Sequence, residues 1–259
     1  MSNRHAAYFI SHAGPDLVLD PREAGQFMGA LGASIPRPDA ILFVSAHWVT
    51  DRPTISTAEL PETIYDFGGF APELYEMKYP APGAPYLAER LAGLNIPAGL
   101  ATDSTRGLDH GAWNVLMLMF PGADIPVAQL SVQPGLGFDH HWKLGEALRP
   151  LRDDGVLVIA SGTMTHNLRD LFGSLGQYDR EPFDYAARFD RDIAALIKVG
   201  DWDGLREANR HPDYRRAHPS DEHFVPLLVA AGAGDGVSGR TIHNSFRGPA
   251  ASMRSFAFD

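Results

Sequence analysis

Residues 40–47 read Ala-Ile-Leu-Phe-Val-Ser-Ala-His, a short apolar run that ends on a histidine. A run of this length, rich in aliphatic and aromatic residues and without polar alternation, is typical of a strand buried on both faces of a sheet. Similar runs occupy residues 6–11, 125–132 and 156–160. The four runs predict the central strands of one sheet.

Segments with helical periodicity separate and follow these runs. Apolar residues recur at spacings of three and four over residues 85–94, 110–120, 141–151, 185–199 and 223–231. This alternation predicts an α/β fold with a mostly parallel or mixed central sheet covered by helices. The tail, residues 241–258, is expected to add one or two closing strands. With 259 residues and no internal repeat or linker, the chain is expected to form a single domain over residues 1–259.

The composition narrows the classes of function. The chain has 22 basic and 32 acidic residues, a formal charge of -10, which disfavours binding to nucleic acid or to anionic membranes. The absence of cysteine excludes disulfides, thiolate metal ligands and a cysteine nucleophile. The N-terminal apolar run is too short for a secretory signal, and no stretch is long enough to span a membrane. We therefore expect a cytoplasmic protein that binds neither nucleic acid nor membrane.

Two histidines stand where predicted strands end. His12 directly follows the run at 6–11, and His47 directly follows the run at 40–46. In open α/β sheets the carboxyl ends of the strands form the edge at which ligands bind. Imidazole is a good ligand for Zn(II) and Fe(II), so this placement predicts a metal site at the carboxyl edge of the strands. The alternative is that each histidine only terminates its strand.

Two more histidines can reach the same edge. His166 lies a few residues beyond the strand at 156–160, on a glycine-containing turn, a position that suits an acid–base group. The alternative for His166 is a role in capping a helix with Asn167. His110 precedes a strongly apolar helix and can point into the same pocket, or it can simply belong to the N-terminal cap.

The pair Glu222 and His223 offers a third metal ligand. Asp221 or Ser220 is expected to cap a helix, with the pair in its first turn. Neighbouring helical residues diverge by about 100°, so only one of the two is expected to bind the ion. A charged first turn that complements the helix dipole accounts for Glu222 but poorly for His223. The remaining histidines considered are expected to be structural or solvated: His5, His140, His141, His211 and His243.

Seven dispersed blocks of sequence carry a resemblance to a known family. They are Ile-Ser-His at 10–12, Val-Ser-Ala-His-Trp at 44–48, Tyr-Asp-Phe-Gly-Gly-Phe at 65–70, Tyr-Pro-Ala-Pro-Gly at 79–83, Leu-Asp-His-Gly-Ala-Trp at 108–113, Ser-Gly at 161–162 with His-Asn-Leu at 166–168, and Glu-His-Phe at 222–224. In these blocks the chain resembles the class III extradiol ring-cleaving dioxygenases, and among them the DOPA 4,5-dioxygenase type.

The resemblance implies a single catalytic domain with a non-haem Fe(II) site, in which Zn(II) is a possible bound ion in isolated protein. By matching position, the metal ligands would be His12, His47 and His223. His166 would be the acid–base residue and His110 a hydrogen-bond donor beside the metal. The wider superfamily has a carboxylate as its third ligand. Glu222 in place of His223, and His166 as a fourth ligand, therefore stay open.

The implied reaction is cleavage of a catechol ring by O2 next to the hydroxyl-bearing carbons, which yields a muconic semialdehyde. A DOPA-like substrate cleaved at the 4,5 position is expected, with caffeate, protocatechuate or a simpler catechol as other candidates. Two alternatives remain: a metal-dependent hydrolase that uses the same histidines, and a non-catalytic metal-binding relative.

The segment 66–85 is rich in proline, glycine and aromatic residues and is expected to be a long ordered loop. Its aromatic character makes it a candidate wall of the catechol pocket, with Tyr65 and Tyr75 contacting the substrate. The alternatives are that these rings pack beneath the loop or form a subunit contact in a homo-oligomer.

Overall fold

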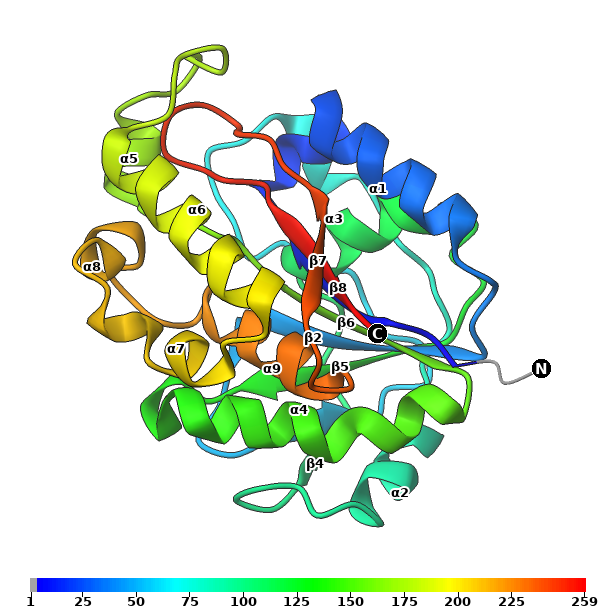
Figure 1. The fold of residues 1–259 in the computed structure, drawn as a ribbon. Helices are drawn as coiled ribbons and strands as arrows, with labels where there is room; N and C mark the ends of the chain where they lie inside the picture. Colours follow the sequence, from blue (N-terminus) through cyan, green and yellow to red (C-terminus); the bar gives the residue numbers. More distant parts are fainter. Residues whose placement is uncertain (1–3) are drawn as a thin grey trace.

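The computed structural model describes residues 4–259, which form a mixed sheet between two layers of helices (Figure 1). The sheet in this part of the chain has eight strands in the order β4-β3-β5-β2-β6-β1-β8-β7. The strands are β1 (Ala7–Ser11), β2 (Ala40–Val49), β3 (Thr54–Ser56), β4 (Ala101–Asp103), β5 (Val127–Val132), β6 (Val156–Gly162), β7 (Gly239–His243) and β8 (Ser255–Phe258).

The four strands predicted from apolar runs form the centre of the sheet. β2 pairs in parallel with β5 on one side and β6 on the other, and β6 pairs in parallel with β1. The predicted tail supplies two closing strands, since β8 pairs antiparallel with β1 and β7 antiparallel with β8. The α/β prediction with a mixed central sheet is confirmed.

Helices cover both faces of the sheet. α1 and α3 pack on one face, and α4 and α9 pack on the other, where α6 and the short helices α7 and α8 extend the layer. The helices are α1 (Arg22–Ser34), α2 (Tyr86–Ala92), α3 (His110–Met119), α4 (Gly137–Asp153), α5 (Leu168–Phe172), α6 (Asp184–Val199), α7 (Trp202–Arg206), α8 (Tyr214–Ala217) and α9 (Val225–Ala233). No helix in the described residues is both long and apolar enough to cross a membrane.

The apolar run of β2 serves two cores at once. Ile41 and Phe43 belong to the core that includes residues of α1 and α3, whereas Leu42 and Val44 belong to the core beneath α4 and α9. All four side chains are fully buried. Because successive residues of a strand point to opposite faces, a strand covered on both faces must be apolar at every position.

The expected helix at 223–231 begins later than predicted. α9 starts at Val225, so Glu222 and His223 lie in the turn before the helix and not in its first turn. The carbonyl of Asp221 accepts from the backbone N–H groups of Phe224 and Val225, which closes this turn. Pro226 fits the start of α9 because the first-turn N–H groups of a helix need no intrahelical partner.

β2 is regular only up to Ser45. Its register with β5 shifts between Val44 and Val49, and its pairing with β6 ends where Ser45 meets Ser161. His47 therefore lies on an irregular stretch at the carboxyl end of a central strand.

Candidate active site

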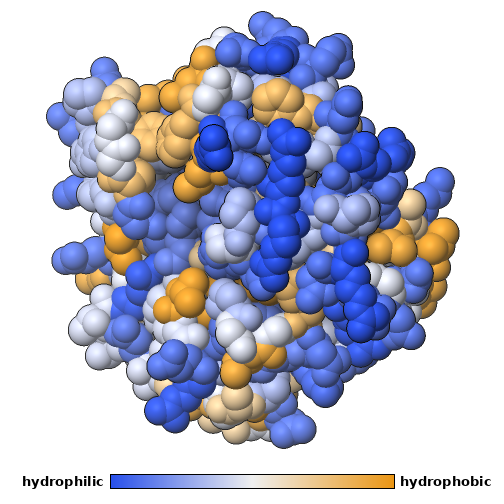
Figure 2. Space-filling view, turned by 90° about the vertical axis from the view of Figure 1, so that its left-hand side faces the viewer, coloured by the Kyte–Doolittle hydropathy of each residue, from blue (hydrophilic) through white to orange (hydrophobic). Residues whose placement is uncertain are grey.

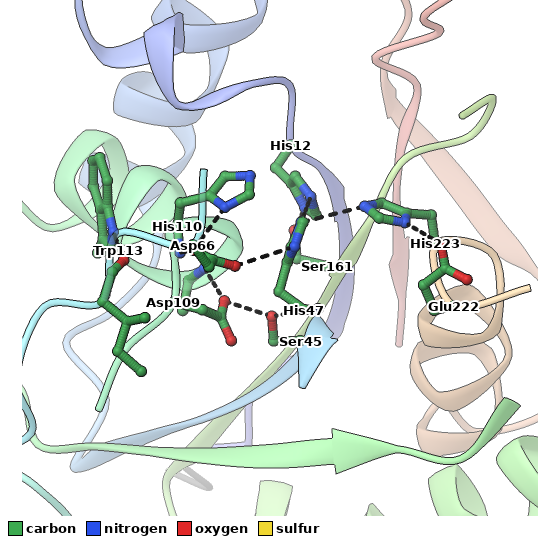
Figure 3. A network of polar contacts seen from close by, with 12 residues as sticks. His12, Ser45, His47, Asp66, Asp109, His110, Trp113, Ser161, Glu222 and His223 are labelled. Atoms are coloured by element: carbon green, nitrogen blue, oxygen red, sulfur yellow. Dashed lines mark hydrogen bonds and ion pairs between the residues drawn. The ribbon is translucent and has the colours of Figure 1, made fainter. Parts of the chain in front are cut away.

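Three histidines from distant parts of the sequence converge at the carboxyl edge of the sheet (Figure 3). His12 follows β1, His47 lies at the end of β2, and His223 lies in the turn before α9. The Nε2 atom of His47 is 3.0 Å from Nε2 of His12 and 3.2 Å from Nε2 of His223. His12 and His223 are buried, and His47 is partly exposed. The sequence-based prediction named these three residues together.

The tautomer of His12 follows from its neighbour. The Ser161 hydroxyl donates to the carbonyl of Ile10 at 2.7 Å, so its oxygen is left to accept from Nδ1 of His12 at 2.9 Å. The proton of a neutral His12 ring is therefore on Nδ1. Its Nε2 carries a lone pair that points at His47.

Carboxylates set the tautomers of the other two rings in the same way. Nδ1 of His47 lies 3.3 Å from a carboxylate oxygen of Asp66, and Nδ1 of His223 lies 3.1 Å from one of Glu222. Because a carboxylate only accepts, each Nδ1 carries the proton, and in the neutral ring each Nε2 is bare. Glu222, the alternative third ligand, therefore contacts the outer nitrogen of His223.

This arrangement fits a bound metal ion. Three bare nitrogens that face one another repel unless a cation lies between them, and the outer nitrogen of a metal-bound histidine usually donates to a carboxylate or another acceptor. Two nitrogens bound to one ion at about 2.1 Å lie roughly 3 Å apart when their bonds are near a right angle. The observed spacings of 3.0 and 3.2 Å agree with this value.

His110 lies beside the three histidines on the first residue of α3. Its ring centre is 4.0 Å from that of His47, and both its backbone N–H and its Nδ1 lie 2.9 Å from one oxygen of Asp66. One carboxylate thus holds His47 with one oxygen and His110 with the other. His12, His47 and His110 also form a compact group of possible metal-binding atoms, within 4.8 Å of one another.

His166 lies on the opposite side of the cluster. Its ring stacks on that of His223, with centres 3.5 Å apart and planes 10° from parallel. Its backbone N–H donates to the carbonyl of Ala217, which fixes the turn after β6. Burial lowers the pKa of His166 to about 3, so the ring is neutral near pH 7.

The electrostatics favour the neutral forms of His12 and His223. Burial and the neighbouring histidines lower the pKa values of His12 and His223 well below the ordinary value. Although burial opposes it, hydrogen bonds from His110 and His47 lower the pKa of Asp66 well below its usual range. Neutral imidazoles and an ionised carboxylate are the protonation states that metal binding requires.

Two glycines allow the close approach of the backbone around these rings. A Cβ atom at Gly111 would lie 2.8 Å from Cδ2 of His47, and one at Gly162 would lie 2.0 Å from the carbonyl oxygen of His223. Both glycines belong to sequence blocks that carry the family resemblance.

Tyr65 and Tyr75, the two predicted substrate contacts, lie in different surroundings. The Tyr65 hydroxyl donates to the carbonyl of Met77 at 2.7 Å, so it holds the loop together. Tyr75 is 38% exposed and packs on Phe67. The ring of Phe67 meets His110 edge-on at 5.6 Å. Phe67 and Asp66 are site residues that the sequence analysis did not single out, although both lie in a block quoted for the resemblance.

Figure 2 shows the face on which α5 and α8 lie. α5 directly follows the turn that carries His166, and α8 precedes the segment that leads to His223. This face is hollowed near its centre, where hydrophilic residues line the hollow and hydrophobic residues border it. The surface beside the site is therefore mixed in polarity.

Comparisons with known proteins identify the family of the chain. Residues 28–257 match the family model described as the catalytic LigB subunit of aromatic ring-opening dioxygenase. A 4,5-DOPA dioxygenase extradiol from Beta vulgaris is 43% identical, over 99% of this chain and 97% of the relative. A 4,5-DOPA dioxygenase extradiol from Escherichia coli K12 is 39% identical, over 93% of this chain and 89% of the relative.

A solved structure has the same fold. The crystal structure of an uncharacterized protein from Escherichia coli K12 superposes with a TM-score of 0.82 at 31% identity, over 99% of this chain and 100% of that chain. The family match and the named relatives identify an extradiol aromatic ring-opening dioxygenase. The chain belongs to the LigB family of these enzymes.

Proposed function

We propose that this protein is an Fe(II)-dependent dioxygenase that cleaves a DOPA-like catechol at the 4,5 position to a muconic semialdehyde. Two relatives that match nearly the whole chain are named 4,5-DOPA dioxygenase extradiol, which supports this choice of substrate. The whole chain, residues 1–259, would act as one catalytic domain. Zn(II) would occupy the same ligands in protein isolated without iron.

The observation that carries the proposal is the convergence of three bare Nε2 atoms. His12, His47 and His223 would hold the metal from one side, each with its Nδ1 proton given to an oxygen acceptor. When bound, Fe(II) would bring the catechol oxygens and O2 together and carry electron density from the ring to dioxygen. Both oxygen atoms of O2 end in the product, so the reaction needs no external reductant.

The other two histidines would manage protons. His166, whose ring stacks on His223 beside the metal ligands, would accept a proton from a catechol hydroxyl and return it to an oxygen of the opening ring. His110 donates from Nδ1 to Asp66, so its Nε2 would accept a hydrogen bond from a catechol hydroxyl and, once protonated, donate one to an oxygen of the opening ring. Phe67 and Tyr75 would form an aromatic wall next to His110.

The test is anaerobic reconstitution of metal-free protein with one equivalent of Fe(II), addition of L-DOPA, and then admission of ¹⁸O2. We expect a yellow product whose mass equals that of DOPA plus both labelled oxygen atoms. Plain catechol, caffeate and protocatechuate run in parallel rank the substrates.

Two outcomes would overturn the proposal. If the Fe(II) protein leaves every catechol intact, ring cleavage of these substrates is excluded. If Zn(II)-loaded protein hydrolyses ester or amide substrates without O2 and the Fe(II) form is inert, the site belongs to a metal-dependent hydrolase. The His47→Ala variant controls for ring oxidation by free iron.

A further inference from the structure

A fully buried carboxylate, Asp109, lies directly behind the histidine cluster (Figure 3). Its Oδ1 accepts from the Ser45 hydroxyl at 2.7 Å and from the backbone N–H of Ala112 at 3.2 Å. Its Oδ2 accepts from Arg106 at 2.6 Å and from the side-chain amide of Gln129 at 2.7 Å. Both oxygens are thus saturated by donors from four different positions.

This network holds the backbone of His47 where the sheet does not. β2 loses its regular pairing beyond Ser45, so the peptide groups of His47 lie outside the regular ladder. The backbone N–H of His47 donates instead to the Ser45 hydroxyl oxygen at 3.2 Å, and Arg106 approaches its carbonyl at 3.4 Å. Both of these partners are themselves bound to Asp109.

The same carboxylate fixes the start of α3. Asp109 is the N-cap residue of this helix, and its own backbone N–H donates to the Gln129 side-chain carbonyl at 3.0 Å. His110 is the next residue. The place of α3 against β5 therefore sets where the His110 ring stands relative to His47.

We propose that Asp109 is a positioning residue that fixes His47 and His110 relative to each other and thereby sets the metal affinity of the site. The inference rests on the proposed function, because it takes His47 as a metal ligand. Asp109 acts through Ser45, Arg106 and the helix start, and it does not reach the reacting atoms itself.

The hydrogen-bond pattern allows a sharp test. Asp109 accepts at both oxygens, so Asp109→Asn puts an N–H₂ group against a donor whichever way the amide turns. Exchanging the partner as well, in Asp109→Asn with Gln129→Glu, returns one amide and one carboxylate to the pair. The amide at position 109 can then donate to the carboxylate at position 129, which restores complementarity within this pair, while Arg106 loses its carboxylate acceptor at position 109.

The experiment is calorimetric titration of metal-free protein with Fe(II) under argon, together with the melting temperature of each variant. Altered support of metal-binding histidines typically costs about 10- to 100-fold in affinity, and we expect a loss in that range for Asp109→Asn. The double variant should regain part of the lost affinity, because it repairs the contact between residues 109 and 129 but not the one with Arg106. In air, Asp109→Asn supplied with saturating Fe(II) should show a lower kcat with little change in KM for L-DOPA.

Asp190→Asn is the matched control. Asp190 is also a buried carboxylate, held by the Ser252 hydroxyl and the Arg254 guanidinium, and among the described residues it bonds to none of the site histidines. This variant should lower the melting temperature and leave the metal affinity unchanged. If Asp109→Asn does not fold, Ser45→Ala is the substitute variant. It removes the hydroxyl that joins Asp109 to the His47 backbone N–H, and it keeps both the N-cap of α3 and the ion pair with Arg106. Ser45→Ala should also weaken metal binding.

The outcomes distinguish failure of the proposed metal-ligand set from failure of the positioning role of Asp109. If His47→Ala binds Fe(II) like the parent protein, the proposed ligand set fails. If His47→Ala loses the metal while folded Asp109→Asn and Ser45→Ala bind it normally, the positioning role of Asp109 is wrong. Equal losses of affinity in Asp109→Asn and Asp190→Asn, or no rescue by the double variant, would also overturn it.

Discussion

At Gly111 the first turn of α3 passes so close to the histidine rings that a methyl group does not fit. A Cβ atom there would lie 2.8 Å from Cδ2 of His47 and 3.2 Å from Cε1 of His12. The first contact is shorter than carbon atoms tolerate and the second is tight, and the rings are fixed by their outer nitrogens. We therefore expect Gly111→Ala to weaken Fe(II) binding by at least the roughly 10-fold that disturbed support of a ligand costs.

Gly29→Ala is the control for this substitution, because Gly29 also lies in a helix and its Cβ would meet only the Leu118 carbonyl at an ordinary 3.6 Å. Alanine favours a helix over glycine by up to about 1 kcal/mol, so this variant should be at least as stable as the parent. Normal metal affinity in Gly111→Ala would show that the rings can move apart without loss.

His166 is expected to separate metal binding from turnover. Its ring stacks on His223 but takes no part in the contacts between the three Nε2 atoms. A general acid–base residue typically supplies about 10² to 10⁴ in rate, so His166→Ala should lower kcat by that factor and keep the metal. Iron content and kcat measured on the same preparation check both statements. Loss of iron would make His166 a ligand, and unchanged turnover would remove it from the mechanism.

The groups around the histidines differ in how far the sequence predicts them. His12 and His47 directly follow apolar runs, so the local sequence pattern alone predicts that both lie at the ends of buried strands. Asp66 follows no such run, and Ser161 follows the run at 156–160 but is a residue type that does not by itself indicate a metal site. Their roles arise from contacts across 44 and 149 positions of the chain, which no local pattern encodes.

Among the elements, α1 is a helix that the sequence analysis did not predict. It contains Gly25, Gly29 and Gly32, and glycine lowers helix propensity. The reason for one of them is tertiary: a Cβ at Gly32 would lie 1.9 Å from the carbonyl oxygen of Met119, where α1 crosses the end of α3. Close packing of α1 against α3 thus requires Gly32, although glycine has a low helix propensity.

Tyr65, just before the loop 66–85, and Tyr75 within it have opposite expected behaviour. The Tyr65 hydroxyl is bonded to the Met77 carbonyl, so Tyr65→Phe should cost about 0.5–1.5 kcal/mol of stability and leave substrate preference unchanged. Tyr75 is more exposed, and no such bond is recorded for its hydroxyl in the described structure. Tyr75→Phe should therefore keep the melting temperature and raise KM for L-DOPA relative to plain catechol. Unchanged relative kcat/KM for the two substrates would exclude Tyr75 from the pocket.

Across the whole molecule, the sheet determines which distant residues can meet. β1 and β2 both flank β6, so the parallel order brings His12 and His47 to the same edge. The sequence predicts this edge because parallel central strands must end together. The approach of His223 depends on the turn before α9 and on the hydrogen bond that its carbonyl accepts from the backbone N–H of Thr163, the residue after β6. The position of His223 at the edge of the sheet therefore depends on tertiary packing, which the local sequence pattern does not reveal.

Stability should fall in mild acid because of histidines buried away from the site. Burial lowers the pKa of His141 to about 4, and its Nε2 accepts from the backbone N–H of Gln133. An unfolded histidine takes up a proton near pH 6.5 while the folded one stays neutral, so stability present above pH 6.5 is lost as the pH falls toward 4. Between pH 6.5 and 5 this amounts to roughly 2 kcal/mol for one such group.

Urea unfolding of the parent protein and of His141→Gln at pH 7 and pH 5 checks this expectation. Glutamine does not titrate, so the variant should lose less stability on acidification than the parent. An identical pH dependence in the two proteins would mean that His141 does not contribute.

The most direct test of the account is the metal content of four variants prepared in parallel: His12→Ala, His47→Ala, His223→Ala and Glu222→Gln. Each is reconstituted with Fe(II) under argon, freed of loosely bound metal and analysed for iron per chain. The account predicts that the three histidine variants lose stoichiometric iron, because each removes one of the converging Nε2 atoms, and that Glu222→Gln keeps most of it. Iron retained by His223→Ala and lost from Glu222→Gln would contradict the account and make the carboxylate the third ligand.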